Sequence, residues 1–294
     1  MSPIPAPRES GFTASTGVPL YWARYGTRGG TPLVILHGGP GASHDYLLPQ
    51  MLALADPGRD LVFYDQRGGG RSRTDDRSSI TWLTQVDDLA AVIAELEIAP
   101  LTLVGYSWGA MLAMLYSIHG TVQRREPMVR RLVLIDPAPV TRAFRDRFEA
   151  EFNRRQTAPR IRAMRDELAG SGLRERDPEA YRQRAFELSV AGYFADPDRA
   201  RGLTPFRVVA RVQQSIWDSL GDFDLTQPGM LDSVHVPALI THGRQDPIPV
   251  ESSQAAAAAL QARLVILEDC GHVPYVEQPT PLFQAVESFL TESS

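Results

Sequence analysis

The amino-acid sequence predicts an α/β protein with a mostly parallel, doubly wound sheet and one inserted helical region. Three features of the 294 residues lead to this prediction: apolar runs that recur along the chain, an amphipathic stretch between two of them, and a long helical region without such runs. Apolar residues make up 43% of the chain and charged residues 22%, as in ordinary globular proteins. One core with an insertion fits this length better than two equal domains.

Six short runs rich in Val, Ile and Leu predict the strands of the parallel sheet. Parallel strands carry such continuous apolar runs because helices cover both faces of the sheet. The runs are residues 33–36, 61–64, 101–104, 132–135, 238–241 and 264–267. We expect helices to connect them in the βαβ order of a doubly wound sheet.

Two further segments complete the predicted sheet layer. Residues 82–96, between the second and third runs, space their apolar side chains at helical intervals and predict a crossover helix. Residues 12–16 and 20–25 flank a Gly-Val-Pro turn signal at 17–19. We therefore expect an antiparallel hairpin at the edge of the sheet.

The pattern changes after the fourth run. Residues 137–235 contain helical stretches rich in Arg and Glu and no clear parallel strand. We interpret them as a helical cap inserted into a core formed by residues 1–136 and 236–294. Basic and acidic side chains at helical spacing are typical of a solvated helix surface.

Composition argues against several classes of function. The sequence pI is about 5.7 and the formal net charge is −5, which gives no general attraction to nucleic acid. Residues 1–11 contain three prolines and no apolar signal segment, and no later stretch approaches the roughly 20 apolar residues of a membrane span. We therefore expect a cytoplasmic protein with no nucleic-acid or membrane partner.

The cysteine and histidine content predicts no metal and no cofactor. Cys270 is the single cysteine, which excludes an internal disulfide and a multi-cysteine metal site. We interpret it as a small buried hydrophobe. The six histidines form no metal-ligand motif, and no dinucleotide fingerprint accompanies the first predicted strand.

The strongest chemical motif is Gly-Tyr-Ser-Trp-Gly, from Gly105 to Gly109. It follows a predicted strand directly and precedes a helical apolar stretch, so Ser107 stands at a strand-to-helix junction. A serine nucleophile at such a turn needs glycine neighbours, because its backbone is strained and other parts of the chain approach closely. The motif predicts Ser107 as a nucleophile, and a serine that merely caps the helix is the structural alternative.

A glycine-rich turn follows the first predicted parallel strand, and it reads His37, Gly38, Gly39, Pro40 and Gly41. In acyl transfer, negative charge develops on the carbonyl oxygen, and two backbone N–H groups can stabilise it. We expect these oxyanion donors at Gly39 and Trp108. His37 is interpreted as a structural residue of the turn rather than a second base.

Asp246 and His272 each lie just beyond a predicted strand, at the sheet edge where catalytic groups gather. A near-neutral imidazole can take the serine proton, and a carboxylate fixes its tautomer. The chain order Ser107, Asp246, His272 is the one expected for the α/β-hydrolase fold, which we therefore predict. Asp136 and Asp269 are the alternatives for the acid.

Together these motifs resemble the proline iminopeptidase family of serine hydrolases. That family is marked by the glycine-rich turn, by the Gly-x-Ser-Trp-Gly motif, and by a loop that reads Asp-Gln-Arg-Gly-Gly-Gly-Arg-Ser here, at 65–72. The resemblance covers residues 10–135 and 236–290 and implies a cap and the release of an N-terminal residue from small peptides. Within the loop, Asp65 and Arg67 are expected to pair and to pin it beside the oxyanion turn.

The family resemblance also implies a carboxylate in the cap, because an aminopeptidase must bind the free α-ammonium group of its substrate. Family members carry a cap segment similar to Arg-Ile-Glu-Asn-His-Tyr-Phe. The nearest counterpart here is 188–194, and alignment on its Tyr-Phe pair places Val190 where the family has glutamate. Glu187, Asp196 and Asp198 are candidates to replace that carboxylate.

Three functions are consistent with these motifs. The first is a peptidase that releases N-terminal proline or another small residue through an acyl-enzyme on Ser107. The second is an esterase or amidase that acts on small esters, amides or lactones without a free amine, which the valine at 190 favours. The third is a non-catalytic binding module, which the complete set of catalytic residues argues against. The expected partner is a small molecule or short peptide, and the oligomeric state is left open.

Overall fold

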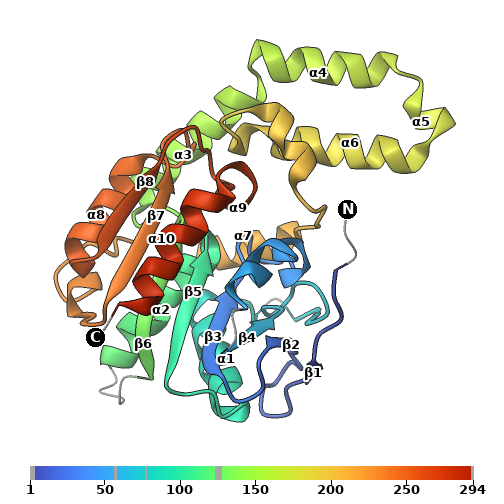
Figure 1. The fold of residues 1–294 in the computed structure, drawn as a ribbon. Helices are drawn as coiled ribbons and strands as arrows, with labels where there is room; N and C mark the ends of the chain where they lie inside the picture. The colour runs from blue at the N-terminus through green and yellow to red at the C-terminus, as the bar shows by residue number, and fades with distance from the viewer. Residues whose placement is uncertain (1–3, 56–57, 77, 123–127, 293–294) are drawn as a thin grey trace.

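The computed structural model of the protein describes residues 4–55, 58–76, 78–122 and 128–292. At the centre of this part of the chain is an eight-stranded sheet with the order β1-β2-β4-β3-β5-β6-β7-β8 (Figure 1). The strands from β4 to β8 in this order pair in parallel, whereas β1 and β2 pair antiparallel. The predicted fold class, a mostly parallel α/β sheet, is confirmed.

Each of the six predicted apolar runs lies inside one strand of the parallel region. The runs lie in β3 (Thr31–Leu36), β4 (Arg59–Tyr64), β5 (Leu101–Tyr106), β6 (Val129–Ile135), β7 (Ala238–Gly243) and β8 (Arg263–Leu267). The two antiparallel strands are β1 (Glu9–Phe12) and β2 (Tyr21–Gly26). Because the parallel strands end at one edge, the loops that follow them meet there. This edge carries the residues with predicted chemistry.

The edge hairpin forms, but its first strand lies earlier in the sequence than predicted. β1 ends at Phe12, where the sequence pattern had predicted a strand beginning. The backbone N–H groups of Ala14 and Ser15 instead donate to the carboxylate of Glu95, at distances of 2.8 Å each for the shortest contacts. Residues 13–19 therefore form the connection, held to the end of helix α1 (Trp82–Glu95) by a contact that a local pattern does not contain.

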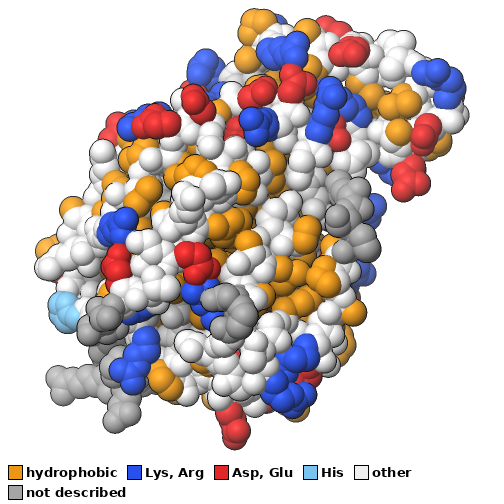
Figure 2. Space-filling view, in the orientation of Figure 1, with side chains coloured by type: hydrophobic (Ala, Val, Ile, Leu, Met, Phe, Trp, Pro, Cys, Tyr) orange, Lys and Arg blue, Asp and Glu red, His pale blue; other side chains and the backbone are white. Residues whose placement is uncertain are grey.

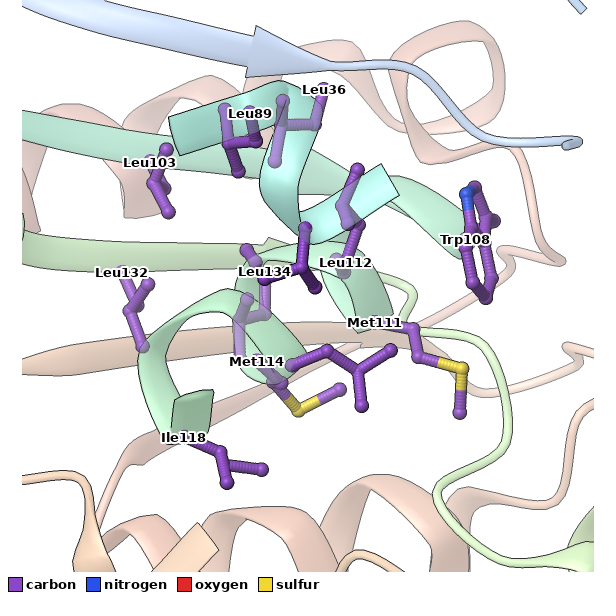
Figure 3. Close-up of a cluster of buried hydrophobic side chains, with 14 of the residues drawn as sticks. Leu36, Leu89, Leu103, Trp108, Met111, Leu112, Met114, Ile118, Leu132 and Leu134 are labelled. Atoms are coloured by element: carbon purple, nitrogen blue, oxygen red, sulfur yellow. The ribbon is translucent and has the colours of Figure 1, made fainter. Parts of the chain in front are cut away.

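Helices cover both faces of the sheet, as expected for a doubly wound fold. One face packs against α1, α2 (Trp108–Val122) and α8 (Val250–Leu260). Figure 3 shows part of this core, in which Leu103 and Leu132 of the strands belong to the same cluster as Met111 and Met114 of α2. The other face packs against α10 (Pro279–Thr291), which lies in front of the sheet in Figure 1. α2, which begins at Trp108, is therefore buried against the sheet.

The chain between β6 and β7 is helical and contains no strand. Its α-helices are α3 (Arg142–Gln156), α4 (Pro159–Gly170), α5 (Leu173–Arg176), α6 (Pro178–Val190) and α7 (Ala210–Leu220). α4, α5 and α6 project from the body (Figure 1), and side chains of both charges gather on them (Figure 2). α7 is different, because its Val212 and Ile216 are buried in the core cluster that contains Trp108. No helix in the described part of the chain has the length and apolarity to cross a membrane.

Candidate active site

Ser107 lies in a sharp turn between β5 and α2, with a left-handed backbone at φ = 53°. The flanking glycines have no room for a side chain. A Cβ on Gly105 would lie 2.4 Å from the carbonyl oxygen of Gly109, and a Cβ on Gly109 would lie 2.1 Å from that of Leu36. The sequence Gly-x-Ser-x-Gly therefore permits a tight strand-to-helix turn that presents Ser107 at the edge of the sheet.

Ser107, His272 and Asp246 form one chain of hydrogen bonds. The Oγ of Ser107 lies 2.9 Å from Nε2 of His272, and Nδ1 of His272 lies 2.7 Å from Oδ2 of Asp246. With Nδ1–H donating to the carboxylate, Nε2 is left as an acceptor for the serine hydroxyl. The three residues that were predicted from separate motifs thus lie in the order that proton transfer from serine requires.

The loops after β7 and β8 hold Asp246 and His272, the predicted acid and base. The backbone N–H of Ile248 donates to Oδ1 of Asp246 over 2.7 Å. Although burial acts to raise the pKa of Asp246, the charge and the hydrogen bond of His272 hold it below the usual value, so this carboxyl is ionised at neutral pH. The backbone N–H of His272 donates to the carbonyl of Tyr193 over 2.7 Å, and its own carbonyl accepts from the hydroxyl of Tyr106.

The predicted oxyanion turn packs directly on the serine. A Cβ on Gly38 would lie 2.8 Å from Cβ of Ser107, and Gly39, with φ = 62°, lines the same cavity as Ser107, Trp108 and Pro40. Gly41 contacts the segment before α7 instead, where its carbonyl accepts from the N–H of Val209 over 3.1 Å. The two residues expected to supply oxyanion donors, Gly39 and Trp108, therefore line the same cavity as Ser107.

His37 stabilises the turn and does not face the cavity. Its Nδ1 donates to the carbonyl of Gly38 over 2.9 Å, and its Nε2 accepts from the N–H of Gln66 over 3.1 Å. Burial lowers the pKa of His37 to about 4, so the ring is neutral at pH 7. These contacts agree with a structural role for His37.

Gln66 is a site residue that the sequence reasoning missed. Its side-chain N–H donates to the carbonyl of His37 over 2.8 Å, and its side-chain oxygen accepts from Nε1 of Trp108 over 2.9 Å. One buried amide therefore joins the predicted oxyanion turn to Trp108, the residue after Ser107. The signal was present as the glutamine of the family loop, but the hydrogen-bond partners lie far away in sequence.

The expected pairing of Asp65 with Arg67 is wrong, because each residue has a different partner. Asp65 is completely buried and accepts from Nδ1 of His44 over 2.7 Å and from the N–H of Arg71 over 2.9 Å. Arg67 donates to both oxygens of Asp88 in α1, at 2.6 and 2.7 Å. The loop is still pinned beside the oxyanion turn, but by two separate contacts, one from Asp65 to His44 and one from Arg67 to Asp88.

A cavity of about 560 Å³ opens onto Ser107 and His272. Nine aromatic residues line it: Tyr46, Tyr106, Trp108, Phe148, Phe152, Tyr193, Phe206, Trp217 and Tyr275. Two charged residues of α3 also line it: Arg145 and Glu149. The Nε of Arg145 donates to Oε1 of Glu149 over 2.7 Å, and the guanidinium lies 4.0 Å from the ring centre of Trp217. Helices between β6 and β7 thus supply much of the wall that faces the serine.

The three candidate carboxylates for replacing the family glutamate do not line this cavity. Glu187 is buried on α6 and pairs with Arg184 over 2.7 Å. Asp196 accepts from the backbone N–H of Asp198, whose own carboxylate pairs with Arg160. Val190, by contrast, does line the cavity. Glu149 is the residue that contributes a carboxylate to the cavity lining, and the sequence reasoning did not single it out.

The alternatives for the acid lie in two different environments. Asp269 is exposed, whereas Asp136 is completely buried and lies beside Asp246. Asp136, Asp246 and His272 each hold one oxygen or nitrogen within 4.8 Å of the others, a spacing that could also suit a metal ion. Two of these groups already hydrogen-bond to each other, so the spacing is explained without an ion. Cys270 is buried nearby, and burial raises the pKa of its thiol.

Comparison with known proteins places this arrangement in a family. A curated proline iminopeptidase of Saccharolobus solfataricus is 25% identical to this chain, over 97% of this chain and 93% of that protein. A curated proline iminopeptidase of Lactobacillus helveticus is 27% identical, over 89% of this chain and 90% of that protein. The solved structure of proline iminopeptidase from Mycobacterium smegmatis has a TM-score of 0.68 at 22% identity, over 96% of this chain and 97% of that one. Since a model of the alpha/beta hydrolase family matches residues 33–285, the chain belongs to that family and is a hydrolase.

Proposed function

We propose that the protein is a serine hydrolase that forms an acyl-enzyme on Ser107. His272 takes the hydroxyl proton at Nε2 while Oγ bonds to the substrate carbonyl carbon. The N–H groups of Gly39 and Trp108 stabilise the oxyanion. The proton then passes from His272 to the leaving group, and a water activated by the same ring releases the acyl group. The observation that carries this proposal is the hydrogen-bonded chain of Ser107, His272 and Asp246, of which Ser107 and His272 line a cavity.

The substrate that we propose is a short peptide with a free N-terminal proline or another small residue. Near-full-length similarity to proline iminopeptidases supports this choice. Glu149 supports it as well, because it places a carboxylate in the wall of the cavity that contains Ser107. Its Oε1 accepts from Arg145, and Oε2 can accept from a substrate ammonium group. The aromatic wall suits the apolar ring of proline.

A carboxylesterase or amidase without amine recognition is the second candidate. Val190 favours it, because an apolar side chain lines the cavity at the position that aligns with the family glutamate. In either case, we propose that residues 137–235 act as a cap over a core of residues 1–136 and 236–294. The α3 and α6 residues in the cavity wall support this division, since the cap would then select the substrate.

The first test compares wild type with Ser107→Ala on matched substrates. The set is prolyl-p-nitroanilide, alanyl-p-nitroanilide, their N-acetylated forms and p-nitrophenyl butyrate. We expect the wild type to cleave the free-amine anilides and to lose this activity when the amine is acetylated. We expect Ser107→Ala to lose turnover of every substrate. Cleavage of the ester alone would favour the esterase, and equal rates for the two proteins would reject the serine mechanism.

Glu149→Gln tests the proposed amine site. Loss of a hydrogen bond between charged groups costs about 1.5–3 kcal/mol, so KM for a free-amine anilide should rise by about tenfold or more. Turnover of p-nitrophenyl butyrate should change little, because that substrate has no ammonium group. Glu151→Gln is the matched control, since Glu151 is on the same helix but pairs with Arg154 and Arg155. Equal KM values for wild type and Glu149→Gln would exclude Glu149 as the amine ligand.

A further inference from the structure

A second buried carboxyl group, that of Asp136, lies beside the acid of the proposed catalytic chain. Asp136 follows β6 directly and has a left-handed backbone at φ = 42°. Its backbone N–H donates to the carbonyl of Thr241 over 2.9 Å, and its Oδ1 accepts from the N–H of Gly243 over 2.8 Å. Asp246 lies in the turn that begins at Gly243, where its N–H donates to the carbonyl of that residue. The ends of β6 and β7 thus hold the two acids together.

The two acids differ in how their oxygens are satisfied. Asp246 has a donor for each oxygen, namely the N–H of Ile248 and the ring of His272. Oδ2 of Asp136 is buried and no donor among the described residues reaches it. Ionisation of both groups would place two buried negative charges side by side, and one oxygen would have no donor among the described residues. A proton on Oδ2 of Asp136 removes both difficulties.

We infer that Asp136 is a neutral carboxylic acid that donates a hydrogen bond from Oδ2 to the carboxylate of Asp246 and so positions it for His272. The inference rests on the catalytic role proposed for Asp246 and His272. Asp246 can accept this bond, because a carboxylate has about four acceptor sites and two are occupied. The result is a longer chain, from Asp136 through Asp246 and His272 to Ser107, that carries one negative charge.

The electrostatic surroundings of Asp136 agree with a protonated group. Burial and the charge of Asp246 raise the pKa of Asp136 well above its usual value. The other titratable groups that interact with Asp136 are Glu277, Cys270, Tyr106 and Tyr275. None of these four side chains can become positive, and only the ring of His272 in the same cluster can. Within the described part of the chain, therefore, no cationic side chain pairs with Asp136 to hold it ionised.

Asp136→Asn and Asp136→Leu separate a neutral donor from a charged group. The amide of Asn can accept from the N–H of Gly243 and donate to Asp246, as the protonated acid does, so kcat/KM should stay within about threefold of wild type. Leu provides neither bond and should lower kcat/KM by about 10-fold to 100-fold, as for other residues that orient catalytic groups. The substrate is whichever free-amine anilide or ester the wild type cleaves.

Two readouts decide the protonation state. If Asp136 is neutral, Asp136→Asn should leave the acid limb of the pH profile of kcat/KM in place. If it is ionised, that limb should move to lower pH, because one negative charge fewer would face the imidazole.

Carbon-13 NMR of aspartate carboxyls reports the protonation state of Asp136 without an activity measurement, so this test holds even if the proposed substrate is wrong. A protonated resonance at pH 7 that is lost in Asp136→Asn supports the inference. Fully ionised aspartates in wild type at pH 7, or a shifted acid limb, would overturn it.

Discussion

Single buried charges determine how the loops around Ser107 are held. Asp65 is the clearest case, because four hydrogen bonds reach its two oxygens from His44 and Arg71. It is completely buried, so each of these donors replaces a water that the carboxylate has lost. The loop at 65–72 thus depends on a charge that has no contact with the cavity.

Asp65→Asn should destabilise the protein in a pH-dependent way. Burial opposes ionisation of Asp65, but the hydrogen bond and charge of His44 hold its pKa well below the usual value. The unfolded chain, with an aspartate pKa of about 3.9, therefore binds the proton more readily. The contribution of Asp65 is complete above about pH 4 and is lost as the pH falls through the lower, folded-state pKa. At pH 7 we expect the variant to lose about 3 kcal/mol of unfolding free energy, measured in urea.

The control for this experiment is Asp75→Asn. The Asp75 side chain is 99% exposed and pairs with Arg211 at the surface, so its loss should change the unfolding free energy by less than about 1 kcal/mol. The difference between wild type and Asp65→Asn should shrink when the urea titration is repeated below pH 4. A difference that is constant from pH 7 to pH 3 would show that the charge of Asp65 is not the stabilising feature.

Residues with a local signature could be predicted from the sequence, and residues defined by distant partners could not. Ser107 is marked by its glycine neighbours, and Asp246 and His272 by their positions after strands. Gln66 acts through Trp108, which is 42 positions away in the chain. Glu149 belongs to a helix whose Arg–Glu pairs at i,i+4 spacing resemble an ordinary solvated surface. Only the folded cavity distinguishes it from such a surface.

At the scale of elements, the strand β5, the turn and the helix α2 act as one unit. Only glycine fits at position 109, because the backbone of Leu36 passes too close for a Cβ. The same unit explains why its position could be predicted well: the apolar run, the glycines and the apolar helix are consecutive in the sequence. The edge hairpin was predicted less well, because Glu95 fixes the connection at 14–15 from another element.

Two glycines of α2 should respond in opposite directions to replacement by alanine. Gly109→Ala places Cβ 2.1 Å from a backbone oxygen, so the turn between β5 and α2 must shift. The unfolding free energy should therefore fall by about 1–3 kcal/mol or more. Gly120→Ala meets nothing within 4 Å and should raise it by about 0.5–1 kcal/mol through helix propensity. Thermal and urea unfolding measure both. Equal stability of the two variants would contradict the close approach at Gly109.

At the scale of the whole molecule, the helical region and the core meet at the loop that carries His272. The carbonyl of Tyr193 accepts from the N–H of His272, and Gly271 lies so close to Tyr193 that a Cβ would be 2.2 Å from its carbonyl oxygen. The sequence predicted the helical region and the core as separate patterns. It could not predict this junction, because Tyr193 ends a 3-10 helix of three residues and His272 lies in a loop, and neither segment is long enough to show periodicity.

Glu277 of α9 (Pro274–Glu277) joins the helical region to the core. Glu277→Gln should therefore lower both the unfolding free energy and the catalytic rate. Its Oε2 accepts from the N–H of Gly271 over 2.7 Å, and its Oε1 accepts from the N–H groups of Ala195 and Asp196. A glutamine has one acceptor oxygen, so its NH2 group must face a buried N–H. The unfolding free energy should fall by about 1–3 kcal/mol.

Because the lost contacts hold the loop of His272, kcat for every substrate should fall together with stability, whereas KM should change less. Glu268→Gln is the matched control: Glu268 lies four residues before His272, is 64% exposed and pairs with Arg244 at the surface. It should leave both kcat and the unfolding free energy nearly unchanged. If Glu277→Gln lost stability but kept the wild-type kcat, the junction would support the fold without positioning the base, and coupling between the helical region and the active site would have to lie elsewhere.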